Sequence, residues 1–269
     1  MHTAKRKLSA SAISTFMKSP KQFYWRYVAN LEPAIPSVGS FSHDALAGTL
    51  WAAFVDRFYK GMGEQENTAK MLSEWHEQTE GWVPPRLRDG LTDAMKAWAN
   101  QYYQMFDPKD GVRNGSEKRV ENDRFIGYLD GLDHTGTIVH ECKSTSRSPQ
   151  ISEQIWKVAN SIQVKLYCVL TQAQGVCLEF AWKDQPHAVY RCDVIDVTPE
   201  QLKAWEQELS ALADLINSLG TDPNNYPCHP DNCCFVTKRM TSMCGYQALC
   251  SEIPGAEIAF KPRVSNRIN

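Results

Sequence analysis

The chain has 269 residues, of which 42% are hydrophobic and 22% charged, and its formal net charge is −2. These values exclude a disordered chain and a bulk polycation, and the length permits one or two domains with a substantial core. No apolar run approaches the ~20 residues of a membrane helix, and the basic start "MHTAKRKLSASAIS" lacks the apolar segment of a secretory signal. We therefore expect a cytoplasmic protein.

Helical spacing of apolar residues dominates the first part of the chain. It predicts a helix over residues 9–30, with a new start at Pro20 because proline suits the first turn of a helix. Three more amphipathic patterns cover residues 41–60, 67–78 and 87–106. This part, about residues 8–110, is expected to form a helical N-terminal extension.

The pattern then changes to short, partly alternating segments that indicate strands. They cover residues 117–121, 125–133 and 136–144, with a turn at "DHTG" between the last two. These segments predict a three-strand meander. A single long helix is expected next, over residues 150–173.

Two further strands and one helix complete the predicted core. The strands cover residues 176–183 and 188–197, and the helix runs from Thr198, its predicted cap, to about residue 220. The order of elements predicts one α/β core, about residues 115–220, within a single domain of residues 1–269. A loop-rich and cysteine-rich tail, residues 221–269, follows.

Basic residues gather near both ends of the chain, at "AKRK" (residues 4–7) and from Lys261 to Arg267. A local basic path for nucleic acid is compatible with the near-neutral total, and so is a scatter of solvated charges. Charge alone leaves both interpretations open.

Three charged residues stand out within the predicted strands. Glu141 and Lys143 are two residues apart, so they share one face of their strand, and Asp130 lies roughly opposite them if the neighbouring strands pair. Two carboxylates suit a hard cation such as Mg²⁺, and a lysine can stabilise the charge that develops on a phosphate. The alternative is a plain surface ion pair between Glu141 and Lys143.

These residues belong to a set of motifs that resembles the PD-(D/E)XK nuclease superfamily. "IGYLDGL" and "HECKSTS" are similar to its G-x-x-D and E-x-K strands. "LSASAISTFMKSPKQFYWRYV" and "GSFSHDAL" resemble the opening helix and the G-x-x-x-H helix of the RecB-like branch, which includes CRISPR-associated RecB-like exonucleases. "QVKLY" has that branch's Q-x-x-x-Y spacing. The motifs follow the family order over about residues 8–250.

The resemblance implies a restriction-endonuclease-like core, in which a mixed central sheet is flanked by helices. It assigns His43, Asp130 and Glu141 to the binding of Mg²⁺ or Mn²⁺ and Lys143 to catalysis. Gln163 and Tyr167 would contact DNA or organise the metal site. The implied activity is that of a metal-dependent DNA exonuclease in recombination, repair or mobile-element DNA processing.

Other interpretations stay open. His43 also suits a helix surface or the core, Gln163 suits a surface and Tyr167 the core. Glu117 suits structural support or solvent exposure more than a ligand role. The whole chain also suits a catalytically inactive, nuclease-fold DNA-binding subunit, or an interaction protein held together by a metal. The sequence contains no Walker A loop, so any ATP-driven unwinding needs a helicase or recombination partner.

The tail carries five of the nine cysteines: Cys228, Cys233, Cys234, Cys244 and Cys250. Such clustering in a reducing compartment is typical of a metal site. Four thiolates hold either an iron–sulfur cluster or a tetrahedral Zn²⁺, and His229 would favour zinc. The other four cysteines lie singly in predicted elements, where a buried apolar role is expected.

The resemblance favours a 4Fe–4S cluster that fixes the tail to the core. Cys244 and Cys250 keep the C-x5-C spacing that RecB-like nucleases use at their last two ligands. Two family positions depart from the pattern, because Ser19 and Thr241 stand where cysteines are common. Zn²⁺ is the alternative.

Overall fold

A mixed sheet carries the central motifs. The computed structural model describes residues 6–33, 43–107, 118–146, 150–184, 187–228, 246, 249 and 260–263. The chain divides into two compact units: a larger one, His43–Gln207, and a smaller one built from Met1–Ser42 and Glu208–Asn269. The single-domain organisation expected from the sequence stays a prediction.

The sheet of the larger unit contains β4 (Gly131–Leu132), β5 (Ile138–Thr145), β6 (Gly175–Trp182), β7 (Ala188–Arg191) and β8 (Ile195–Asp196). Its order is β4-β5-β6-β7, and β8 also pairs with β6. Strands β5 and β6 are parallel, whereas the other pairs are antiparallel. Every residue of β6 is buried, as expected for a strand with partners on both edges and cover on both faces.

The three segments pair antiparallel in chain order, as the predicted meander requires, but the middle strand expected over 125–133 is wrong as a single element, because it is broken at Asp130. Its first half, β3 (Ile126–Leu129), pairs with β2 (Lys118–Glu121), and its second half, β4, pairs with β5. At the break, the Asp130 carboxylate accepts the backbone N–H of Cys142 at 2.9 Å. A side chain thus replaces a backbone partner of β5, and the strand direction changes there.

Two other predicted elements are also divided. The helix expected over 150–173 is wrong as a single element: α6 (Ile151–Ala159) ends before Ser161, whose hydroxyl accepts the Val164 N–H and caps α7 (Ile162–Thr171). The strand expected over 188–197 splits into β7 and β8. Between them the thiol of Cys192 accepts the Leu178 N–H at 3.2 Å, in place of a backbone carbonyl.

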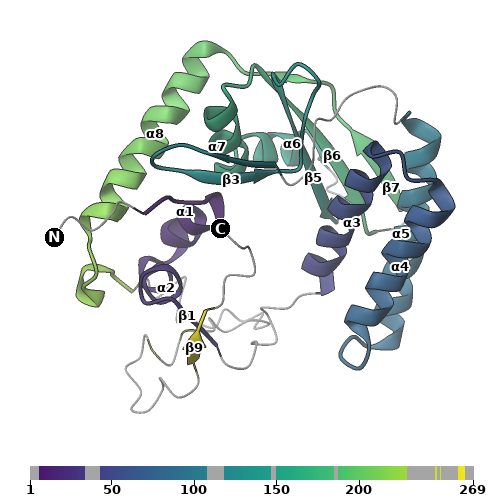
Figure 1. Ribbon diagram of the computed structural model, residues 1–269, viewed down its shortest axis with the longest axis horizontal. Coiled ribbons are helices and arrows are strands. Elements are labelled where there is room, and N and C mark those ends of the chain that lie inside the picture. Colours follow the sequence, from purple (N-terminus) through teal and green to yellow (C-terminus); the bar gives the residue numbers. More distant parts are fainter. Residues whose placement is uncertain are drawn as a thin grey trace. The chain divides into compact units, whose positions relative to one another are not determined.

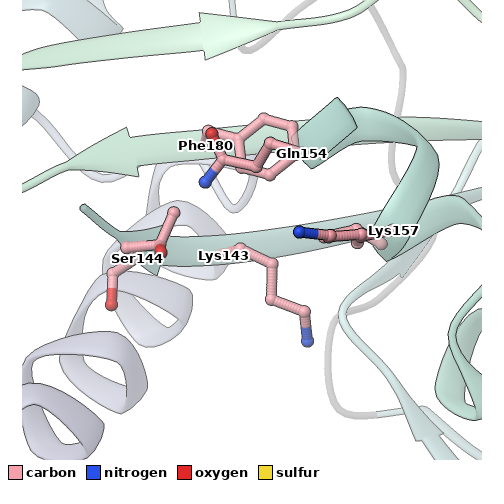
Figure 2. A pocket seen from close by; sticks show the side chains of 7 residues that line it. Lys143, Ser144, Gln154, Lys157 and Phe180 are labelled. Atoms are coloured by element: carbon pink, nitrogen blue, oxygen red, sulfur yellow. The ribbon is translucent and has the colours of Figure 1, made fainter. Parts of the chain in front are cut away.

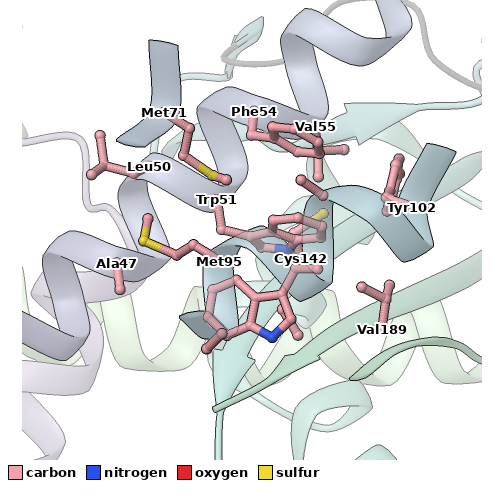
Figure 3. Packing of buried hydrophobic residues seen from close by; sticks show 14 of the residues in the cluster. Ala47, Leu50, Trp51, Phe54, Val55, Met71, Met95, Tyr102, Cys142 and Val189 are labelled. Carbon is pink, nitrogen blue, oxygen red and sulfur yellow. The ribbon is translucent and has the colours of Figure 1, made fainter. Parts of the chain in front are cut away.

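Helices α3 (His43–Tyr59) and α5 (Pro85–Met105) pack on one face of the sheet, and α4 (Glu64–Thr79) packs against both of them; all three lie close to their predicted ranges (Figure 1). Aromatic side chains fill the space between these helices and the sheet, and Figure 3 shows Trp51, Phe54 and Tyr102 packed near Cys142. The indole N–H of Trp98 also donates to the Trp182 carbonyl at 2.8 Å. This face therefore forms the main core.

None of the described helices is both long enough and apolar enough to cross a membrane. The four cysteines outside the tail, Cys142, Cys168, Cys177 and Cys192, are buried, as their isolated positions predict.

The smaller unit begins with two short helices, α1 (Ala10–Lys18) and α2 (Pro20–Phe23), followed by a π-helical turn. Ser19 is fully buried, and its hydroxyl caps α2 by accepting the Gln22 N–H at 3.1 Å. Strand β1 (Leu31–Pro33) pairs with β9 (Phe260–Pro262), a pairing that the sequence pattern does not indicate. Helix α8 (Pro199–Ser218), capped by Thr198 as predicted, runs from the larger unit into the smaller one.

The turn between β4 and β5 is organised by the buried carboxylate of Asp133. It accepts the backbone N–H groups of Thr135, Thr137 and Ile138 at 3.1, 2.7 and 2.8 Å. Burial alone would raise the pKa of Asp133, but the hydrogen bonds from Thr135, Ile138 and Thr137 outweigh it and lower the pKa. The charged form therefore stabilises the fold.

We expect Asp133→Asn to destabilise the protein by about 1–3 kcal/mol at neutral pH, because the charged acceptor is lost. A carboxyl group whose pKa is lower in the folded protein stabilises the fold at pH values above its unfolded-state pKa of about 3.9. This stabilisation disappears as the pH falls through the folded-state pKa. Urea unfolding at neutral and at acid pH should therefore show a difference between variant and wild type that shrinks in acid. Asp93→Asn, at an exposed α5 position, is the control. A difference independent of pH would contradict the prediction.

Candidate functional site

The acidic residues of the motifs meet at the junction of β4 and β5. The register pairs Gly131 with His140 and Leu132 with Val139, so its continuation sets Asp130 opposite Glu141. Glu141 is fully buried, and Asp130 is half-buried. The side chains of Glu141 and Lys143 share one face of β5, while Cys142 between them packs into the core on the other face. The expected clustering of Asp130, Glu141 and Lys143 is present.

Lys143 joins this strand to helix α7. Its ammonium contacts Glu141 Oε1 and donates to Gln163 Oε1 at 2.8 Å. Burial works to lower the pKa of Lys143, but the charges of Glu141 and Asp130 outweigh it and raise the pKa. The buried negative charge of Glu141 is thus matched by a cation that is only partly buried, with 32% of its side chain exposed.

Gln163 and Tyr167 extend the cluster along α7. They are one helical turn apart, and the Gln163 amide donates to the Tyr167 hydroxyl at 3.3 Å. Burial raises the pKa of Tyr167, and the nearby carboxylates of Glu141 and Asp130 raise it further. The hydroxyl therefore stays protonated and available as a donor, and the two α7 residues lie in one hydrogen-bonded chain with Lys143.

Gly127, the glycine of the G-x-x-D motif, allows this arrangement. A Cβ atom at Gly127 would lie 2.7 Å from Cε1 and 3.0 Å from Cδ1 of Tyr167. These distances are shorter than van der Waals contact, and the ring is buried. The glycine lets the Tyr167 ring lie directly on β3.

We expect Gly127→Ala to destabilise the protein by about 1–3 kcal/mol through overpacking, and to displace the Tyr167 hydroxyl from Gln163. Thermal unfolding measures the first effect, and a crystal structure of the variant measures the second. Gly90→Ala is the matched control, because nothing lies within 4 Å of a Cβ atom at this helical position. Alanine there should be neutral or mildly stabilising. Equal behaviour of the two variants would refute the proposed contact.

His43 is placed differently from the other predicted site residues. It begins α3, on the helical layer that packs on the opposite face of β5, and its ring lies 3.9 Å from the Asp44 carboxylate. The described contacts do not join His43 to Asp130 or Glu141. A part in metal binding stays a prediction for His43.

The donor set at the β4–β5 junction fits a hard divalent cation. Asp130 and Glu141 supply carboxylate oxygens, and Mg²⁺ commonly takes one or two carboxylates and keeps several waters. Within the described residues, no group of three or more His, Cys, Asp or Glu side chains is arranged to hold a metal. Because Mg²⁺ keeps several waters, two carboxylates are enough for a site that water and substrate complete.

A second polar cluster, on the core face of the sheet, is one that sequence reasoning missed. Glu179 of β6 is fully buried, lies 3.1 Å from Arg191 Nη2 and accepts the Tyr102 hydroxyl at 2.8 Å. Its carboxylate also lies 3.5 Å from His140 Nδ1 and 3.7 Å from Cys142 Sγ, the two neighbours of Glu141. The only sequence signal was a glutamate inside an apolar strand, "VCLEFAW". This cluster braces β5 directly behind the candidate site.

The predicted cysteine site falls mostly outside the described residues. Cys228 is exposed and follows a short 3-10 helix, Pro223–Asn225. Cys233, Cys234, Cys244 and Cys250, together with His229, lie outside the part of the chain that the structure describes, as does Glu117. The iron–sulfur or zinc site stays a prediction.

Comparison with known proteins identifies the family. No curated protein matches the sequence. A solved structure from Eubacterium rectale, provisionally named an exonuclease, has a TM-score of 0.50 and 12% identity, and the match covers 93% of this chain and 94% of that one. A phage-related exonuclease from Haemophilus somnus 129PT matches 57% of this chain and 81% of its own, with a TM-score of 0.36 and 11% identity. The model of the PD-(D/E)XK nuclease superfamily matches residues 7–251. The chain therefore belongs to the PD-(D/E)XK nuclease superfamily, and the expected α/β fold is confirmed.

Proposed function

We propose that this protein is a Mg²⁺- or Mn²⁺-dependent DNA exonuclease that hydrolyses phosphodiester bonds from DNA ends. The observation that carries the proposal is the convergence of Asp130, Glu141 and Lys143, joined through Gln163 to Tyr167. Family membership supports a nuclease, and the arrangement of these residues supports an active one.

Each residue of the cluster has a distinct role in this proposal. Asp130 and Glu141 bind the cation, which supplies Lewis acidity to the scissile phosphate and activates water when it is bound. Lys143 donates to the phosphate oxygens as negative charge builds up on them. Gln163 and Tyr167 hold the Lys143 ammonium in position and offer further donors to the DNA. We also retain His43 as a proposed ligand of this cation.

The test uses end-labelled linear and covalently closed circular DNA, single- and double-stranded, with Mg²⁺, Mn²⁺ or chelator. We expect metal-dependent loss of the linear substrates and survival of the circles. Asp130→Asn should abolish the loss, and asparagine keeps an oxygen that can accept the Cys142 N–H.

The other outcomes separate the alternatives. Cleavage of circles would retain the nuclease and reject the exonuclease. Folded protein that binds DNA but leaves every substrate uncut would make it an inactive DNA-binding subunit. Cleavage that requires added ATP and a second protein would instead indicate a helicase or recombination partner.

For the tail we propose a 4Fe–4S cluster held by Cys228, Cys244, Cys250 and one of Cys233 and Cys234, with Zn²⁺ as the alternative. Clustered thiolates in one short segment support either metal. Iron, sulfide and zinc content of protein purified without oxygen distinguishes the two. Absence of all three would reject a metal site in the tail.

A further inference from the structure

A pocket opens beside the candidate site, on the face of the sheet that carries Lys143 (Figure 2). Its volume is about 420 Å³. Its walls come from β5, β6 and α6, and the side chains that matter here are Lys143, Thr145, Gln154, Lys157 and Phe180. Ser144 also borders the pocket, but its hydroxyl lies toward Gly48 of α3 on the opposite face of β5. The fully buried Phe180 lies opposite Lys143 in the β5–β6 register. The pocket is therefore continuous with the proposed catalytic lysine.

The chemistry of this pocket suits an anion. Two lysines line it together with hydroxyl and amide groups, and no carboxylate is among the described lining residues. The Lys157 ammonium pairs with Glu153 at 2.6 Å, but both side chains are largely exposed, at 66% and 46%. An exposed pair one helical turn apart is weak, so a phosphate group can displace the Glu153 carboxylate from Lys157.

Helix α6 also presents an aromatic surface. None of its side chains is fully buried, although four of its nine residues are large and apolar. Trp156 is 65% exposed and immediately precedes Lys157. An exposed indole next to a cation is the combination that single-stranded nucleic acids use, with a base stacked on the ring and a phosphate on the charge.

We propose that α6 is a strand-holding element: Lys157 binds the phosphate next to the scissile one in the pocket, and Trp156 stacks on a base of the same single strand. The proposal rests on the proposed nuclease function, because Lys143 as the catalytic residue is what places the scissile phosphate beside this pocket. Glu153 limits the affinity of this subsite by competing for Lys157.

The test measures binding of a fluorescein-labelled single-stranded oligonucleotide by anisotropy, in chelator and over a range of salt concentrations. Lys157→Ala should bind more weakly and lower the slope of log K against log salt by about 0.7, the value for one phosphate contact to a single strand. Lys157→Arg should keep the wild-type affinity and the wild-type salt slope. Glu153→Gln should bind more tightly, an effect opposite in sign that misfolding does not produce.

Trp156→Ala should weaken binding by about tenfold with an unchanged salt slope, because stacking carries no counterion release. Trp156→Phe should retain part of the affinity. The controls are Trp82→Ala, at an exposed tryptophan in the α4–α5 connection, and Lys96→Ala, at an exposed lysine in α5. Thermal unfolding verifies that every variant folds.

The outcomes separate this proposal from the nuclease itself. If the wild type degrades DNA but the α6 variants bind like the controls, the strand-holding role is wrong and the nuclease stands. If the wild type neither binds nor degrades DNA, both fail. Weakening by Lys157→Ala with an unchanged salt slope would reject the phosphate contact.

Discussion

Replacing Lys143 with alanine is expected to lower the single-turnover rate of DNA cleavage by about 100- to 1000-fold, since a charged donor is lost where negative charge develops. Saturating DNA keeps the measurement on the chemical step rather than on binding. Lys96→Ala, an exposed position on the helical layer of the opposite sheet face, should cleave at the wild-type rate. A Lys143 variant with wild-type turnover would remove this residue from the mechanism.

The same variant should reveal the cation through stability. Without Lys143 the fully buried Glu141 carboxylate loses its ion-pair partner, so the metal-free variant should unfold at a lower temperature than the wild type. A cation that binds only the folded state raises the unfolding temperature with concentration. We therefore expect Mn²⁺ to restore much of the loss. No response to Mn²⁺ or Mg²⁺ would argue against a site at Glu141.

Replacing Glu179 with alanine is expected to destabilise the protein by about 3–5 kcal/mol, the usual cost of removing one partner from a buried ion pair. Arg191, whose side chain is only 20% exposed, would lose its carboxylate, and Tyr102 would lose the acceptor of its hydroxyl. Urea unfolding measures the change. Glu77→Ala, at an exposed position on α4, should leave the free energy of unfolding almost unchanged.

A double-mutant cycle tests whether this loss belongs to the pair. The combined Glu179→Ala, Arg191→Ala variant should be less destabilised than the sum of the single variants, because the second substitution no longer leaves a buried charge unmatched. Strict additivity would mean that the two residues stabilise the fold independently. Because Glu179 contacts both neighbours of Glu141, the single variant should also lower cleavage at temperatures where it remains folded.

Local signals in the sequence predict most of the helices and the face of β5 that carries chemistry. Ser19 before Pro20, and Thr198 before Pro199, mark helix starts because hydroxyls cap and proline suits the first turn. The alternation of side chains is enough to set Glu141 and Lys143 together and Cys142 on the core side. These features depend on neighbours in sequence, so the sequence is sufficient.

The missed features depend on partners far away in the chain. The break at Asp130 needs the Cys142 amide, and the division of β7 from β8 needs Leu178 beside Cys192. The β1–β9 pair joins Glu32 to Lys261. Glu179 could be recognised as a buried ion-pair residue only once β6 was known to lie between β5 and β7. Periodicity carries no information about such contacts.

The hydrogen bond from the Cys142 amide to Asp130 couples the candidate site to the backbone of β5. A carboxylate that belongs to the site also completes the hydrogen bonding of the central sheet, so a ligand that moves Asp130 acts on the backbone of β5. The hydrogen-exchange rate of the Cys142 amide should therefore change when a ligand binds the site. Ligand binding at the site and the hydrogen bonding of the central sheet are therefore coupled, and exchange of the Cys142 amide proton reports on both.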